Sequence, residues 1–180
     1  PTTLPPAPPM VYALRLRASL FGANAPDPRV LAKRTIKSFG TSEFVDGDYQ
    51  KGWKFTIDVQ TIHLDNAYPG VLPKSWLVLS KPGYQELYRA SAVAESSLTR
   101  YAMSGKTTKV DLDKPVDIGL FSGASYREVA VFGQSEKLPL LAERPLPATE
   151  TTDLAARFLK LASVVDLPKG RLLLVEGKIQ

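Results

Sequence analysis

The chain of 180 residues contains no cysteine and only one histidine, His63. Without cysteine, neither a disulfide framework nor a thiolate metal site is available, and one histidine is too few for a metal cluster. The longest apolar runs fall well short of the ~18 residues that a membrane-spanning helix requires. The sequence therefore predicts a globular chain without a resident metal, and any membrane contact is expected to be peripheral.

Sequence patterns typical of catalytic sites are also missing. Residues 104–108, SGKTT, resemble the end of a phosphate-binding loop, but that motif requires a glycine where the chain has Arg100. A G-x-S-x-G nucleophile pattern does not occur, and a hydrogen-bonding role is expected for His63. The aspartates at 111 and 113 are interpreted as solvated residues of a turn or strand. The sequence thus predicts a protein that is not an enzyme and uses no cofactor.

The net charge of +5 favours anionic partners such as lipid or nucleic acid. Asp27 and Pro28 form a typical helix start, and Gly40 a typical helix end, so a helix is predicted over 28–39. Its expected basic face has no acidic partner in the same stripe and consists of Arg29, Lys33, Arg34 and Lys37. An ordinary solvated face is the alternative interpretation.

The rest of the chain shows the alternation of apolar and polar residues that indicates strands. The region 84–102 has both helical propensity and alternation, whereas 151–167 has clear helical spacing. We predict an α+β fold in which an antiparallel sheet packs against two main helices. Residues 11–180 form its single domain, after an arm at 1–10. The other expected strands cover 11–20, 54–62, 76–80, 108–113, 118–121, 125–132 and 171–179.

The arm contains five prolines within its first nine residues. Such a segment is expected to be extended, and it has no core of its own. It is either a tail or a preformed segment that docks in a groove of another copy, because an extended chain loses little entropy on binding. The candidate residues for this self-association are Pro5, Pro6, Pro8, Pro9 and Tyr12.

A second unusual segment is the loop AYPGVLPKSW at 67–76, in which Pro69, Gly70 and Pro73 exclude regular structure. Loops are usually polar, yet this one carries apolar side chains. They either fold back onto the core or contact a lipid interface or a partner, a role that suits amphipathic aromatic residues. The candidate contact residues are Tyr68, Val71, Leu72, Lys74 and Trp76.

The segment PVDIGLFSG at 115–123 resembles one found in rhabdovirus matrix proteins, with Asp117 in place of the family's asparagine. Upstream, Met103 and the segment 105–107 match the family's Met-Gly-Lys-Thr turn with one inserted residue. The loop 67–76 falls where this family has a proline-flanked apolar loop. The order of segments is similar over about 11–179, and the resemblance favours a strand for 84–102.

The resemblance implies a structural protein that self-associates, lines the inner face of the viral envelope and condenses the ribonucleoprotein during budding. Its partners would be other copies, an anionic inner leaflet, the viral ribonucleoprotein and the glycoprotein tail. It would reside in the virion beneath the envelope, and in the host cytoplasm and membrane periphery. Better-known members have a lysine-rich arm, whereas this chain has no lysine before Lys33 and no P-P-x-Y motif. The chain is therefore also compatible with a plant-infecting member of the family. In that case the basic face of the helix predicted over 28–39 would contact the lipid.

Two other classes of protein remain as alternatives. A basic nucleic-acid-binding or capsid-type protein would use the same cationic face on phosphates. A small enzyme would depend on His63, or on Asp111 and Asp113, within a pocket.

Overall fold

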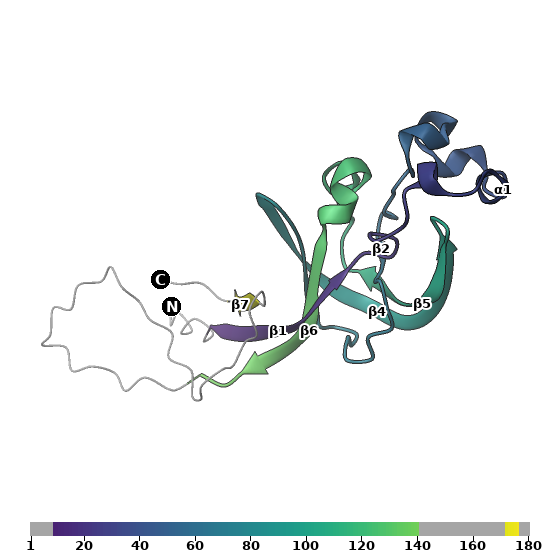
Figure 1. Cartoon of the computed structure of the whole chain (residues 1–180). Coiled ribbons are helices and arrows are strands. Elements are labelled where there is room, and N and C mark those ends of the chain that lie inside the picture. Colours follow the sequence, from purple (N-terminus) through teal and green to yellow (C-terminus); the bar gives the residue numbers. More distant parts are fainter. Residues whose placement is uncertain (1–8, 141–171, 177–180) are drawn as a thin grey trace, which may run out of the picture.

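Seven antiparallel strands form one sheet in the computed structural model, which describes residues 9–140 and 172–176 (Figure 1). Their order across the sheet is β2-β5-β4-β3-β6-β1-β7. The strands are β1 Met10–Ser19, β2 Thr61–His63, β3 Trp76–Lys81, β4 Tyr84–Arg100, β5 Met103–Leu112, β6 Ala130–Leu138 and β7 Leu172–Glu176. The expected antiparallel sheet is thus confirmed, as are strands near 11–20, 76–80 and 84–102.

The long strand β4 divides the sheet into two halves. Its first part, up to Arg89, pairs with β3, and its second part, from Ala90, pairs with β5. A register shift between Ala90 and Ala92 marks the division, as expected where a bulge bends a strand. The sheet curls further, because Phe21 N–H donates to the His63 carbonyl at 2.8 Å and connects the end of β1 to β2. The curled sheet therefore encloses its main core.

Apolar side chains fill this core from alternate positions of the strands. They include Leu16 and Ala18 from β1 and Leu20 directly after it. Leu77 and Leu79 come from β3, and Val110 and Leu112 from β5. A smaller cluster of Leu14, Val78 and Phe132 lies apart from it. Because β3 contributes to both clusters, its run WLVL is buried almost continuously, as in strands covered on two faces.

The prediction of one continuous helix over 28–39 is wrong. The chain forms a 3₁₀ turn, η1 Pro28–Val30, and one α-helical turn, α1 Lys33–Ile36. Leu31 and Ala32 between them are extended, with ψ of 149° and 140°. Leu31, Ile36 and Phe39 pack against the main core from either side of this break, whereas the Val30 side chain is 77% exposed.

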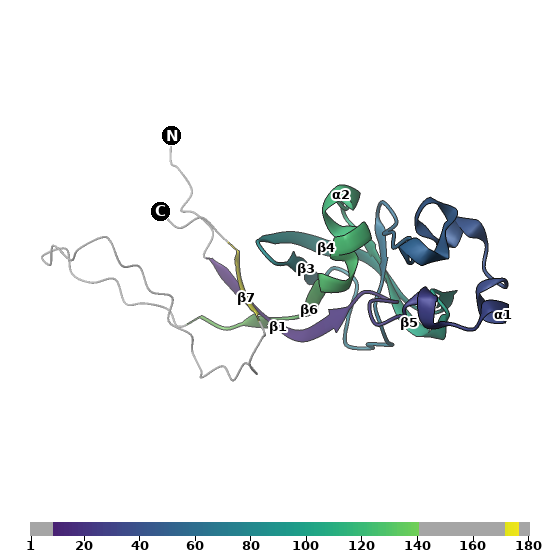
Figure 2. The same ribbon diagram turned by 45° about the horizontal axis from the view of Figure 1, so that its top comes forward.

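The remaining helical segments within the described residues are also short. They are η2 Thr41–Glu43, η3 Val45–Gly47, η4 Tyr49–Lys51, α2 Ile118–Phe121 and η5 Gly123–Glu128. The helix predicted at 151–167 lies outside the described residues. The fold is therefore a mixed, sheet-rich domain with few short helices, and α1 and β7 lie at opposite ends of it (Figures 1 and 2).

Four local expectations need correction. The first part of the strand expected at 125–132 is the 3₁₀ helix η5, and β6 begins only at Ala130. Most of the strand expected at 54–62 is not a strand, because its backbone bonds to the loop before β6, for example through Gly123 N–H and the Phe55 carbonyl at 3.0 Å. The segment 105–107, which the resemblance matched to a turn, lies within β5. The strand expected at 118–121 is α2, because the Asp117 carboxylate caps it by accepting from Leu120 N–H.

The turn that joins β4 to β5 consists of Tyr101 and Ala102, with φ of 56° and 58°. Two-residue hairpin turns with two positive φ values normally use asparagine and glycine. Tyr101 tolerates this conformation because its buried ring packs against Phe55, with ring centroids 4.7 Å apart, and against Trp53 at 6.0 Å. A β-carbon on Gly22 would lie 2.3 Å from the same ring, so the ring also requires a glycine there.

Replacement of Ala102 by glycine is expected to stabilise the protein by ~0.5–1 kcal/mol, because glycine adopts positive φ without steric strain. The free energy of unfolding in urea measures this effect. Ala94→Gly, on the exposed part of β4, is the matched control and should destabilise by ~0.5–1 kcal/mol. If both variants lose stability, Ala102 carries no conformational strain.

Candidate functional site

The proline-bounded loop exposes only one of its two aliphatic side chains. Val71 is 3% exposed and belongs to the main core, whereas Leu72 is 60% exposed. The role of exposed contact residue that was expected for Val71 is thus wrong. Lys74 is exposed and has a positive φ of 67°, and its N–H donates to the Ala90 carbonyl at 2.7 Å. The loop therefore presents Leu72 from a fixed backbone.

The two aromatic residues expected at this interface have mainly structural contacts. The Tyr68 N–H donates to Thr108 Oγ1 at 2.7 Å, and its hydroxyl donates to Asp65 Oδ1 at 2.8 Å. Burial and the Asp65 bond raise the pKa of Tyr68 to about 12. Trp76 is half-buried in β3, where its ring centroid lies 6.4 Å from that of Tyr12. These contacts anchor the loop and leave Leu72 and Lys74 as its exposed candidate contact residues.

The structure also corrects the composition of the N-terminal arm. Tyr12 belongs to β1, where it pairs with Lys137 of β6, so it is a residue of the sheet. Pro9 precedes β1 and is half-buried. The docking role expected for Pro5, Pro6 and Pro8 lies outside the described residues.

A groove of about 260 Å³ separates the loop from β4. Leu72 and Pro73 line one side of it, and Val93 and Glu95 line the other. Beyond Ala90, β4 pairs only with β5 among the described residues, which leaves its other edge open. Such edges are usually protected by lysine or proline, but Ser91 to Thr99 contains neither. We call Leu72, this groove and the open edge of β4 the groove surface.

Backbone geometry shows which groups face the open edge. Thr108 N–H donates to the Asn66 carbonyl, so even-numbered residues of β5 face β2 and odd-numbered ones face β4. Ser96 lies opposite Thr107 and therefore bonds to β5. Ser97, by alternation, directs its N–H and carbonyl toward the open edge. The edge thus offers a row of backbone donors and acceptors beside Leu72.

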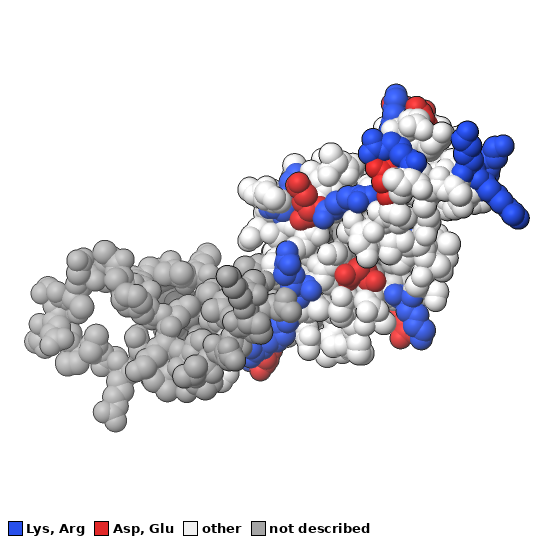
Figure 3. Space-filling model, viewed as in Figure 1, with Lys and Arg blue, Asp and Glu red and all other residues white. Residues whose placement is uncertain are grey.

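Basic side chains gather at the end of the molecule occupied by α1 (Figure 3). Lys33, Arg34 and Lys37 are exposed, and none forms a salt bridge within the described part of the chain. Arg29 differs, because its guanidinium pairs with Asp27. Its hydrogen bonds lower the pKa of Asp27 to about 2. The expectation that this face lacks an acidic partner is therefore wrong for Arg29.

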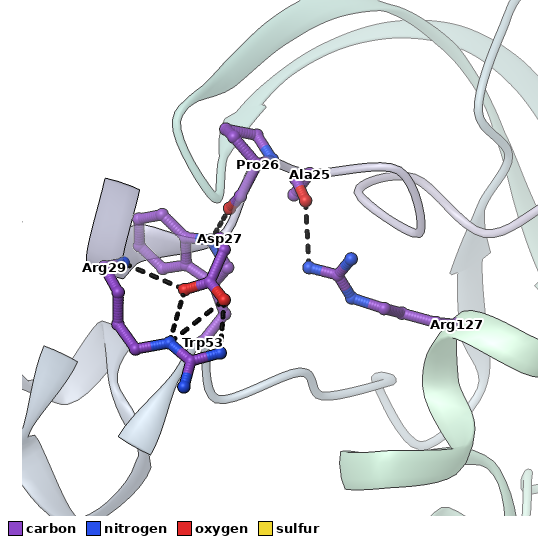
Figure 4. Close-up of polar contacts among 6 residues, drawn as sticks. All are labelled: Ala25, Pro26, Asp27, Arg29, Trp53 and Arg127. Atoms are coloured by element: carbon purple, nitrogen blue, oxygen red, sulfur yellow. Dashed lines mark hydrogen bonds and ion pairs between the residues drawn. The ribbon is translucent and has the colours of Figure 1, made fainter. Parts of the chain in front are cut away.

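A cavity of about 440 Å³ lies beside this basic end, between η1, the segment 51–55 and η5. Trp53 forms part of its wall and donates from Nε1 to the Pro26 carbonyl at 2.7 Å. Arg127 donates to the Ala25 carbonyl at 2.9 Å (Figure 4). Sequence reasoning missed this cavity because its walls come from four separate segments, which no local sequence pattern connects.

The residues that a small enzyme was expected to use form separate hydrogen bonds within the fold. Asp111 accepts from Thr61 Oγ1 at 2.7 Å, and Asp113 accepts from Arg89 N–H at 2.9 Å. His63 lines a cavity of only about 20 Å³, and its buried Nδ1 has no hydrogen-bond partner among the described residues. The described residues also contain no group of three acidic or histidine side chains that could hold a metal ion.

Comparison with known proteins gives no relative: no family model, curated protein or solved structure matches this chain. Within the described residues, no helix is long and apolar enough to cross a bilayer.

Burial lowers the pKa of His63 below its ordinary value. The unfolded chain therefore binds a proton at this residue more readily than the folded chain as pH falls below ~6.5. We expect the free energy of unfolding to be lower at pH 5.5 than at pH 7.5, and His63→Gln to reduce this difference. Urea titrations of both proteins measure the effect. An identical pH dependence in the variant would show that His63 does not contribute.

Proposed function

We propose that this chain is a structural matrix protein of the rhabdovirus type. In this proposal it self-associates, lines the inner face of an envelope membrane and condenses the ribonucleoprotein during assembly. The carrying observation is that the molecule has two separate exposed surfaces that no other part of the described chain covers. One is the basic end at α1 with Val30, and the other is the groove surface with Leu72. A protein that links a membrane to further copies of itself needs two such surfaces.

The basic end has the composition of a weak contact with anionic lipid. Each basic residue near such a membrane contributes ~1 kcal/mol, so Lys33, Arg34 and Lys37 together supply ~3 kcal/mol. Burial of the Val30 side chain, 77% exposed in the free protein, adds ~1 kcal/mol. The total of ~4 kcal/mol corresponds to a dissociation constant of ~1 mM. One molecule therefore binds weakly, and stable attachment requires several linked copies.

The groove surface supplies a means of linking copies. Two identical open strands can pair antiparallel about a two-fold axis, and this continues each sheet into its neighbour. The only charged residue from Ser91 to Thr99 is Glu95, and it is paired within the molecule with Lys106 at 2.7 Å. Pairing about Ser96 would place Glu95 opposite Ser97 of the second copy, without apposed like charges. Exposed Leu72 beside the groove adds apolar contact area.

A nucleic-acid-binding or capsid-type protein is the second candidate function. It is favoured by the same cations, Lys33, Arg34 and Lys37, which form no salt bridge within the described residues and would neutralise phosphates and release counterions. In that case binding falls steeply with salt and does not depend on Val30. Contacts with ribonucleoprotein and a glycoprotein tail, and a location beneath a viral envelope, belong to the matrix proposal as expectations.

Flotation of the purified protein with vesicles tests the membrane contact. We expect binding to anionic but not to neutral phosphatidylcholine vesicles, weaker at high salt, because the contact combines charge with one inserted side chain. Val30→Asp should reduce the bound fraction. Val59→Asp is the matched control, because Val59 is also exposed, at 56%, and lies outside the basic end. Absence of flotation at protein concentrations at which sedimentation shows the wild type to be oligomeric would refute the membrane role, and binding to RNA would then favour the second candidate.

Sedimentation of proline variants tests the self-association. Ser97→Pro removes a backbone N–H that faces the open edge, so it should leave the fold intact and weaken dimerisation about tenfold or more. Leu72→Asp should weaken dimerisation as well. Ser96→Pro is the contrast, because it removes a backbone hydrogen bond to β5 and should lower the free energy of unfolding by ~1 kcal/mol or more. Wild-type dimers that persist in Ser97→Pro would exclude pairing through this edge.

A further inference from the structure

We propose that the cavity beside η1 binds a small organic phosphate, a phosphomonoester attached to a compact apolar or ring-shaped body. The cavity volume of about 440 Å³ lies within the range of small-molecule sites. A water molecule occupies about 30 Å³ in the liquid, so the space exceeds what an inorganic ion needs. This proposal is independent of the matrix function.

The charge lining the cavity favours a dianion. Four basic residues line it, but Arg29 is paired with Asp27, and Lys51 with Asp46 at 3.0 Å. The other two, Lys54 and Arg127, have no salt bridge within the described part of the chain. A phosphomonoester carries a charge of about −1.5 to −2 at neutral pH, which matches these two cations.

Arg127 is held in a position suited to phosphate. Its guanidinium lies over the Phe55 ring, 5.0 Å from the centroid, and uses one N–H on the Ala25 carbonyl. An arginine has five N–H donors in a rigid fork, so the remaining donors are available to a ligand. Because stacking on an aromatic ring already orients the side chain, less conformational entropy is lost when the phosphate binds.

The apolar part of the wall accounts for the organic body of the ligand. Phe55 and Trp53 form one side, with Val45 and Pro28 nearby. Gly52 and Gly123 also line the cavity, and an added β-carbon at either position would meet no atom within 4 Å. An aromatic and aliphatic wall beside two cations fits a sugar or inositol phosphate better than a free ion.

The position of the cavity also relates it to the basic end. Arg29 lines the cavity, and Val30 follows it in the chain as an exposed side chain. The phosphate-bearing body can come from a lipid headgroup or from a soluble metabolite, since both have the same chemistry. If it comes from a lipid, its binding would bring Val30 and Lys33 toward the bilayer surface.

Tryptophan fluorescence tests this proposal directly. The chain has two tryptophans, so Trp76→Phe leaves Trp53 as the only reporter, at the cavity wall. At ~0.15 M salt, which screens diffuse surface attraction, we expect a saturable change in emission with inositol 1,4,5-trisphosphate or glucose 6-phosphate, and none with glucose. A lack of saturable change, confirmed by calorimetry, would overturn the proposal.

Variants in the same background assign the site. Lys54→Gln/Arg127→Gln should weaken binding about tenfold or more, because both proposed phosphate contacts are lost. Ala124→Leu should weaken phosphate binding because the larger side chain fills the cavity. Since the charge is unchanged, a loss of binding in this variant shows that the ligand enters the cavity and is not held by surface charge alone. Lys137→Gln, an exposed charge on β6, is the matched control and should bind like the parent. Binding that survives both cavity variants would overturn the assignment.

Vesicles then distinguish the source of the phosphate. Phosphatidylcholine vesicles with about 5% phosphatidylinositol 4,5-bisphosphate are compared with vesicles of equal charge made with phosphatidylserine. If the protein prefers the phosphoinositide vesicles and Ala124→Leu abolishes this preference, the ligand is a lipid headgroup. Binding of glucose 6-phosphate without that preference assigns a soluble ligand. Both results support the phosphate site, and failure of anionic-vesicle binding by itself affects only the matrix proposal.

Discussion

The packing of Tyr101 against the aromatic residues of the helical end determines how the two parts of the molecule are joined. Tyr101 lies at the tip of the β4–β5 hairpin, in a backbone conformation that a residue with a side chain rarely adopts. Its ring is buried among Trp53, Phe55 and Tyr126, and Gly22 leaves room for it. The contact fastens the tip of the hairpin to the segment 53–55, and burial of one large ring offsets the strain of the turn.

This attachment has consequences for both exposed surfaces. The hairpin bends away from β3 at Ala90 and reaches the helical end, so that one edge of β4 has no neighbouring strand among the described residues. The same aromatic cluster fixes Trp53 and Phe55, which form the wall of the cavity beside η1. The open strand edge and the cavity are therefore products of a single packing arrangement, although they lie on different parts of the molecule.

The energetic scale of these surfaces explains why the proposed function requires assembly. Three cations and one valine give only ~4 kcal/mol at an anionic membrane, which is too little to hold a monomer there. Linked copies bind with avidity, because each later contact is intramolecular. A phosphate in the neighbouring cavity would add specificity to a contact that otherwise depends on charge alone. In this proposal, attachment to an anionic membrane therefore depends on self-association of the protein.

The sequence by itself indicated a strand at 11–20, because period-two alternation follows directly from the pleat of a strand. It left 84–102 ambiguous between helix and strand, and its strand predictions at 54–62 and 118–121 were mostly wrong. It also indicated an unusual apolar loop at 67–76 and a basic segment after Asp27. Only the tertiary structure decided that Val71 is buried while Leu72 is exposed, and that the helix expected at 28–39 is broken. Such outcomes depend on contacts between distant segments, which local spacing does not encode. The cavity with Lys54 and Arg127 has the same origin, since its walls meet only after the chain has folded.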